Sequence, residues 1–165
     1  MSSFRATGTL RIAVLGSLVL AGAVSAGAQE TVTISVPLAV SFPVTDVSRS
    51  TSGAPNVTTV SFSNASLSPG RVLRISVQPD AAAFTPPGGS SMPASNVSWS
   101  NLGANGGVGM NGTLSSSSYA LVFQSDPATT SGHIDLGWAL AAPGSGIRAG
   151  NNQLTIRCKV ESITP

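Results

Sequence analysis

The chain has 165 residues, of which 8% are charged and 41% are hydrophobic, and it contains one cysteine. Charged residues make up about 25% of an ordinary soluble domain, so Ser, Thr, Asn and Gly must supply most of the polar surface here. The single cysteine, Cys158, excludes a disulfide within the chain.

Residues 1–28 have the pattern of a secretory signal peptide. Two arginines give a positive start, 12–24 is an apolar run, and Ala26–Ala28 is a small-x-small cleavage motif. The apolar run is shorter than the roughly 18–20 residues that span a bilayer, which disfavours a retained anchor. We therefore expect a leader at 1–28 and a secreted or cell-surface domain at 29–165 with no membrane span; a periplasmic location is also compatible.

Removal of this leader changes the charge balance. Two of the eight basic residues leave with it, and six basic and six acidic residues remain, so the mature domain has no net charge. No cluster of Lys and Arg is left to bind phosphates, which argues against a nucleic-acid partner.

Alternating apolar and polar residues mark the first part of the mature domain. Alternation with period two places one set of side chains on each face of a strand. The predicted strands are Thr31–Val36, Leu38–Val44 with Phe42 in the core, Asn56–Ser63 and Arg71–Gln78. The turn signal Ser68-Pro69-Gly70 separates the last two, so we expect them to pair antiparallel.

The middle of the chain is rich in Gly, Pro, Asn and Ser. Pro79–Pro93 is predicted to be irregular, with Phe84 covering the core, and Asn96–Ser100 is a short strand around Trp99. The low-complexity run Asn101–Ser118 contains two Asn-Gly pairs, and these indicate one or two loose hairpins.

Three further strands are predicted towards the C-terminus. They are Tyr119–Gln124 with Tyr119, Leu121 and Phe123 on one face, His133–Leu140 with Ile134, Leu136, Trp138 and Leu140 inward, and Asn152–Glu161 with Leu154, Ile156, Cys158 and Val160 inward. About seven short strands predict an all-β fold, a single antiparallel two-layer β-sandwich, with a barrel as the alternative. Cys158 is expected to be a small buried hydrophobe, with an intermolecular disulfide as the alternative.

Two stretches resemble bacterial cell-surface modules. T-V-T-I-S-V-P-L at Thr31–Leu38 resembles the first strand of pilin-type immunoglobulin-like domains, and Leu73–Trp99 is similar in style to WxL-like β-sandwich modules. The W-x-L motif of that family occurs once, at Trp138–Leu140, and the residues that follow Trp99 do not form one. Chaperone-assembled pilins usually carry a disulfide, which this chain cannot form. The resemblance implies an immunoglobulin-like sandwich at the surface of a bacterial cell, and it implies no mechanism.

The candidates for chemistry are few. His133 is the only histidine and lies two residues from Asp135, but no serine sits in a G-x-S-x-G context, so a solvated pair is expected and the protein is predicted not to be an enzyme. There is no second His or Cys for zinc or copper, and the acidic residues are dispersed. Asp126 and Asp135 flank one loop and are the one pair considered for a shared ion. No cofactor is predicted.

Aromatic residues offer one possible binding surface. Trp99, Tyr119 and Trp138 have flat rings suited to the apolar face of a sugar, but Trp138 fits the inward set of its strand. Trp99 and Tyr119 are therefore the candidate ligand-stacking residues, although a core position is favoured for Trp99.

We expect a non-catalytic structural, adhesive or surface-assembly module. Its partners would be copies of itself, other cell-surface proteins or wall glycans. A carbohydrate-binding module is the alternative function, and an enzyme using His133 is the third.

Overall fold

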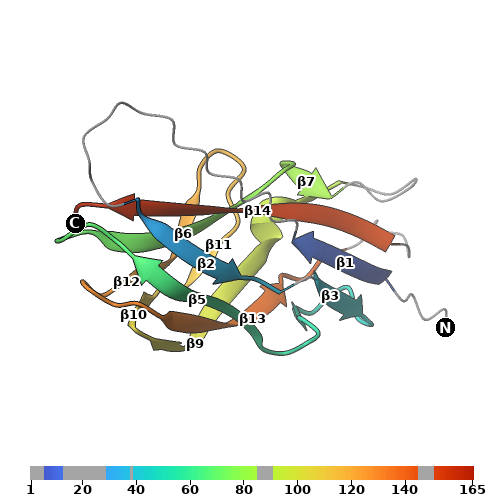
Figure 1. Cartoon of the computed structure of the whole chain (residues 1–165). Coiled ribbons are helices and arrows are strands. Elements are labelled where there is room, and N and C mark those ends of the chain that lie inside the picture. The colour runs from blue at the N-terminus through green and yellow to red at the C-terminus, as the bar shows by residue number, and fades with distance from the viewer. Residues whose placement is uncertain (1–5, 13–28, 38, 85–90, 145–150) are drawn as a thin grey trace.

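The computed structural model describes residues 6–12, 29–37, 39–84, 91–144 and 151–165. These residues form an all-β structure (Figure 1) with one short 3-10 turn at Ala94–Asn96 and no α-helix among them. The predicted fold class is confirmed at this level: the strands are arranged in largely antiparallel sheets.

The first sheet has the strand order β10–β12–β6–β14–β1–β3. These strands are β1 (Ala6–Ile12), β3 (Ala39–Val44), β6 (Val72–Pro79), β10 (Gly107–Gly109), β12 (Ala120–Ser125) and β14 (Asn151–Ile163). Their pairings are antiparallel except that of β1 with β14, which is parallel.

The second sheet has the order β11–β9–β13–β5–β2, and β4 adds to β13. These strands are β2 (Thr31–Ser35), β4 (Thr51–Ser52), β5 (Thr58–Ser66), β9 (Val97–Asn105), β11 (Gly112–Thr113) and β13 (Gly132–Leu140). A separate short pair joins β7 (Ala83–Phe84) to β8 (Met92–Pro93).

Both sheets contribute apolar side chains to one core. Phe62 of β5 and Phe123 of β12 meet across the two sheets with ring centroids 5.6 Å apart. The inward sets predicted from alternation are buried in β5, β6 and β13, and Phe84 and Phe42 are buried as expected. Period-two alternation works here because successive side chains of a strand point to opposite faces, and one of these faces lies on the core.

One predicted pairing is wrong. The segments 56–63 and 71–78 do form strands, but β5 lies in the second sheet and β6 in the first. The turn around Gly70, whose φ is +78°, therefore carries the chain from one sheet to the other. A Pro-Gly turn signal reports a change of direction, and it does not say whether the next strand hydrogen-bonds to the last.

The Gly-rich run 101–118 is more ordered than predicted. β9 continues to Asn105, and Gly106 then takes a φ of +73°, as the first Asn-Gly pair predicted. β10 and β11 follow, but they join different sheets, β10 beside β12 and β11 beside β9. The run is thus a connection between the sheets and not a pair of free hairpins.

The buried face of β12 differs from the predicted one. The register shifts between Leu121 and Phe123, and Val122 and Phe123 are both buried. A bulge inserts one extra residue and moves the inward set by one position. Tyr119, predicted on the core face, is consequently 39% exposed.

Candidate functional site: the position between β14 and β3

The strand β1 lies within the segment expected to be a leader. Figure 1 shows it between the beginning of β14 and the strand β3. It pairs in parallel with Asn151–Ile156 of β14 through residues 7–12, and antiparallel with Ala39–Val44 of β3 through residues 6–11. We call the position that β1 occupies between these two segments the slot.

The two walls of the slot carry some of the most buried apolar residues of the protein. Val40, Phe42 and Val44 of β3 are 0–3% exposed, and Leu154 and Ile156 of β14 are 0–1% exposed. In the register, each of these five lies opposite a residue of β1. A slot without a strand would leave two rows of backbone polar groups without hydrogen-bond partners.

On the sides that face away from the slot, both walls have few backbone hydrogen bonds to other strands. Beyond the slot, the Ser41 N–H donates to the Ala54 carbonyl at 3.0 Å, and the Ala54 N–H returns a bond at 2.7 Å. β14 pairs with β6 only from Ile156 onward. Before that point, Thr155 exchanges bonds with Asp80, whose N–H donates to the Thr155 carbonyl at 2.9 Å and whose carboxylate accepts from the Thr155 N–H at 3.1 Å. The occupant of the slot is therefore the main hydrogen-bonding partner of both walls.

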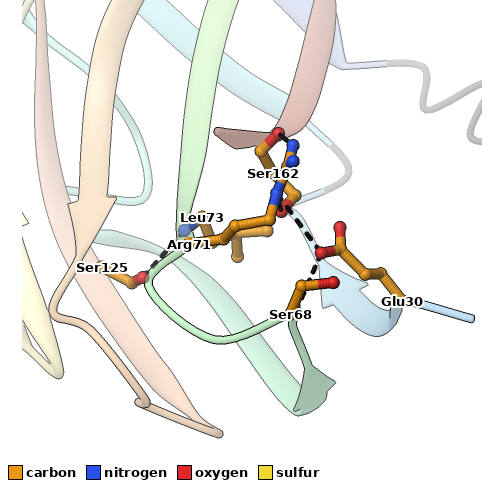
Figure 2. A network of polar contacts seen from close by, with 6 residues as sticks. All are labelled: Glu30, Ser68, Arg71, Leu73, Ser125 and Ser162. Carbon is orange, nitrogen blue, oxygen red and sulfur yellow. Dashed lines mark hydrogen bonds and ion pairs between the residues drawn. The ribbon is translucent and has the colours of Figure 1, made fainter. Parts of the chain in front are cut away.

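A polar cluster at the start of β2 joins three remote parts of the chain (Figure 2). The Glu30 carboxylate accepts from the Ser68 N–H at 2.8 Å and lies 3.3 Å from Nε of Arg71. Arg71 also donates from Nε to the Ser162 hydroxyl at 2.8 Å, and from its terminal nitrogen to the Ser162 carbonyl. We call Glu30, Ser68, Arg71 and Ser162 the latch, since it ties the start of β2 to the β5–β6 turn and to the end of β14.

Electrostatics favour the charged form of Glu30 in the latch. Hydrogen bonds from Ser68 hold the pKa of the Glu30 carboxyl below its ordinary value, and the Arg71 charge acts in the same direction. Close by, the Leu73 N–H at the start of β6 donates to the Ser125 hydroxyl at 2.9 Å, which secures the neighbouring strands.

The two candidate ligand-stacking residues do not form a shared surface. Trp99 is 2% exposed: its ring packs on Trp138 at 5.7 Å, and its Nε1 donates to the Met110 carbonyl at 2.8 Å. Trp99 therefore occupies the core position that was the favoured of its two interpretations. Tyr119 is exposed, with the Lys159 ammonium 5.4 Å from its ring centroid.

The His133–Asp135 pair lies on β13, and both residues are half-buried. The Asp135 carboxylate accepts from the Thr59 hydroxyl at 2.6 Å on the adjacent strand β5. Asp126 begins the β12–β13 connection, where its N–H donates to the Gly106 carbonyl at 3.0 Å. Within the described parts of the chain, no three His, Cys, Asp or Glu side chains converge as metal ligands would.

Cys158 is half-buried on β14 and packs against the edge of the core. Burial raises the pKa of its thiol to about 11. This agrees with the predicted role as a small hydrophobe, although the side chain is less enclosed than Leu154 and Ile156 earlier on the same strand.

Sequence reasoning missed the slot because it assigned residues 6–12 wholly to the leader. A signal was present: A-T-G-T-L-R-I alternates polar and small or apolar residues before the apolar run begins. Residues 6–12 fit both a leader and a strand, and only the leader was predicted for them.

Comparison of the chain with protein-family models and with curated proteins finds no match. Among the described residues, no helix has the length and apolar character needed to cross a membrane.

Proposed function

We propose that this protein is a secreted, non-catalytic surface-assembly module that joins to other chains by accepting a strand into the slot between β14 and β3. The observation that carries the proposal is the pairing of β1 with both walls. β1 belongs to residues 1–28, which have the pattern of a cleaved leader. After cleavage, the mature domain would present both walls without a partner.

Strand addition fits this situation physically. An extended peptide that joins a sheet gains affinity from main-chain hydrogen bonds and specificity from alternate side chains. Burial of the walls adds about 25 cal/mol for each Å² of apolar surface removed from water. Long exposed edges otherwise lead to uncontrolled association, and the low charge of this protein would oppose that only weakly.

We also propose a particular kind of fold and a location for the protein. The two sheets with a common core support a β-sandwich of the immunoglobulin-like kind, placed at the cell surface of a bacterium by export. Other cell-surface proteins, wall glycans and further copies of the chain are the candidate partners. The proposal assigns no catalytic step to any residue.

The test compares two forms of the protein by sedimentation and light scattering. The mature chain, from Gln29 onward, is expected to associate, and the full chain that retains Ala6–Ile12 is expected to stay monomeric. A synthetic A-T-G-T-L-R-I peptide added in excess should keep the mature chain monomeric as well.

The matched control peptide carries Asp in place of Leu10, whose register partners are Leu154 and Val40. It should compete much less well, because a carboxylate would have to enter an apolar site. A mature chain that remains monomeric without peptide, and binds neither cells nor wall material, would refute the proposed function.

A further inference from the structure

The basic residues of the strands that follow residue 29 all belong to the first sheet. Arg74 lies on β6, and Arg157 and Lys159 lie on β14. The strands of the second sheet contain no Lys or Arg, and their one acidic residue is Asp135. The mature chain has no net charge, but its two sheets carry different charges.

The pairing of β14 with β6 places the basic side chains on the solvent side of the first sheet. In the register, Arg157, Lys159 and Glu161 of β14 lie opposite Gln78, Ser76 and Arg74 of β6. Residues that lie opposite each other in an antiparallel pair point to the same face. This set alternates with the core residues Ile75 and Val77, so it points away from the core. Three bases and one acid give this outer face a net charge of +2.

Tyr119 stands beside the basic side chains. It is 39% exposed, and the Lys159 ammonium lies 5.4 Å from its ring centroid. Gln78, opposite Arg157, donates from Nε2 to the Ser116 carbonyl at 2.8 Å. This bond fastens the exposed serines 116–118, which directly precede Tyr119, to the same part of β6. A flat ring, cations and hydroxyl groups therefore occur together on one surface.

The three cations differ in how far other groups already engage them. Lys159 pairs with Glu161 at 2.6 Å, and Arg74 donates from Nε to Oε1 of Gln124 at 2.8 Å. Arg157 is exposed, and no ion pair joins it to another residue of the described ranges. Its planar guanidinium can bind one carboxylate through two parallel hydrogen bonds. Arg157 is thus the cation best placed to hold an anionic ligand.

We propose that this face binds a carboxylated polysaccharide, a polymer of uronic acids, with Arg157 holding a carboxylate and Tyr119 stacking on a pyranose ring. The ligand is opposite in charge to the face, and the serine hydroxyls can bond to the hydroxyls of the sugar. The inference goes beyond the proposed function. It uses β6, β12 and the part of β14 that follows Ile156, and it does not require an open slot.

Other classes of partner fit this face less well. A protein interface has an apolar centre, but the exposed apolar side chains of this sheet, Tyr119 and Val108, lie at opposite ends of β12. Anionic membranes are recognised by about four to eight clustered Lys and Arg residues, more than this face contains. A single exposed ring beside a few cations suits a sugar that carries a carboxylate.

Binding of the full chain to immobilised polymers, measured by biolayer interferometry, tests the ligand. Polygalacturonate is expected to bind, and added salt should weaken the binding because it screens exposed charges. The methyl ester of this polymer keeps the pyranose rings without the charge, and polyphosphate keeps the charge without the rings. Both should bind several-fold more weakly. Equal binding of either control polymer, or no binding of polygalacturonate, would overturn the proposal.

Two pairs of variants test the site. Arg157→Gln should bind polygalacturonate about two- to five-fold more weakly, the range expected for one exposed ion pair. Arg49→Gln is its matched control, since it removes an exposed charge from the loop between β3 and β4 and should bind as wild type does. Tyr119→Ala should weaken binding, whereas Tyr119→Phe keeps the ring and should not. Equal urea midpoints would show that Arg157→Gln and Arg49→Gln fold alike. Unchanged binding in Arg157→Gln or in Tyr119→Ala, or an equal loss in Arg49→Gln, would place the binding elsewhere and refute the site.

These measurements are independent of the association expected for the mature chain. If the mature chain associates but the full chain does not bind polygalacturonate, this inference fails and the proposed function stands. If polygalacturonate binds as expected and the mature chain stays monomeric, the inference stands and the strand-accepting role of the slot fails.

Discussion

At the scale of single residues, the burial of two tryptophans depends on partners for their ring N–H groups. Trp138 donates to the Thr58 hydroxyl at 2.8 Å, and Trp99 donates to a backbone carbonyl. Buried polar groups are costly unless they are bonded, so these partners make the tilted Trp99–Trp138 pair possible. The sequence could place Trp138 inward by alternation, but it could not reveal an acceptor 80 residues away.

Thr58→Val tests this arrangement. The variant keeps the shape of the side chain but leaves the Trp138 N–H buried without an acceptor, and we expect the free energy of unfolding to fall by about 1–3 kcal/mol. Urea denaturation followed by tryptophan fluorescence measures the change. Thr59→Val is the control: it removes a hydroxyl bond to Asp135 near the surface, and a loss under about 1 kcal/mol is expected. Equal losses in both variants would contradict the argument.

The Cys158 thiol provides a second residue-scale prediction. Its pKa is raised to about 11 by burial, and the thiolate is the reactive form. Alkylation of the native protein should therefore be slow at pH 8 and keep accelerating up to about pH 11, whereas the unfolded chain should level off near its ordinary pKa. The thiol's contribution to stability is complete below the unfolded pKa and is lost as pH rises towards 11. Native labelling as fast as that in urea would show that the thiol is open to solvent.

At the scale of elements, alternation located most strands, but the partners of each strand could not be read from it. β5 and β6 were found as segments and then paired wrongly, because the turn between them crosses from sheet to sheet. The face of β12 was wrong because a bulge shifts its inward set. Pairing and bulges are decided by contacts between segments far apart in sequence, and a local pattern carries no record of these contacts.

The glycines of 101–118 show how a low-complexity run can be ordered. A Cβ on Gly107 would lie 2.2 Å from the Gln124 carbonyl oxygen and 2.7 Å from Cα of Ser125. A Cβ on Gly112 would lie 2.5 Å from the Trp99 ring. Glycine thus permits β10 and β11 to approach the core closely, which is the opposite of the looseness that composition alone indicated.

Gly107→Ala is expected to be strongly destabilising for this reason. The new methyl group meets backbone atoms that cannot move aside, and overpacking of this kind costs about 1–3 kcal/mol or more. Gly103→Ala, on the preceding strand β9, is the matched control. A Cβ there would have an Asp135 oxygen 3.9 Å away as its nearest neighbour, so a change within about 0.5 kcal/mol is expected. Equal urea midpoints for the two variants would show that β10 can move away from β12.

At the scale of the whole molecule, the slot and the latch concern the same end of the chain. The strand β1 fills the slot, and Glu30, two residues past the expected cleavage site, fastens β2 at the opposite sheet. A sequence can suggest a leader and a strand separately. It cannot show between which strands a segment will lie, because that relation exists only in the folded chain.

The latch makes a pH prediction with a definite sign. Since the pKa of Glu30 is lowered in the folded chain, its contribution to stability is present above the unfolded value and is lost as pH falls through the lowered folded value. The difference in unfolding free energy between wild type and Glu30→Gln should therefore be largest near neutral pH, about 0.5–1 kcal/mol, and should vanish in acid. Arg71 is the charged partner, and its bonds to Ser162 are common to both chains. Urea denaturation of both chains across this pH range measures the difference. A difference in unfolding free energy that does not change with pH would show that the charge of Glu30 does not stabilise the folded chain.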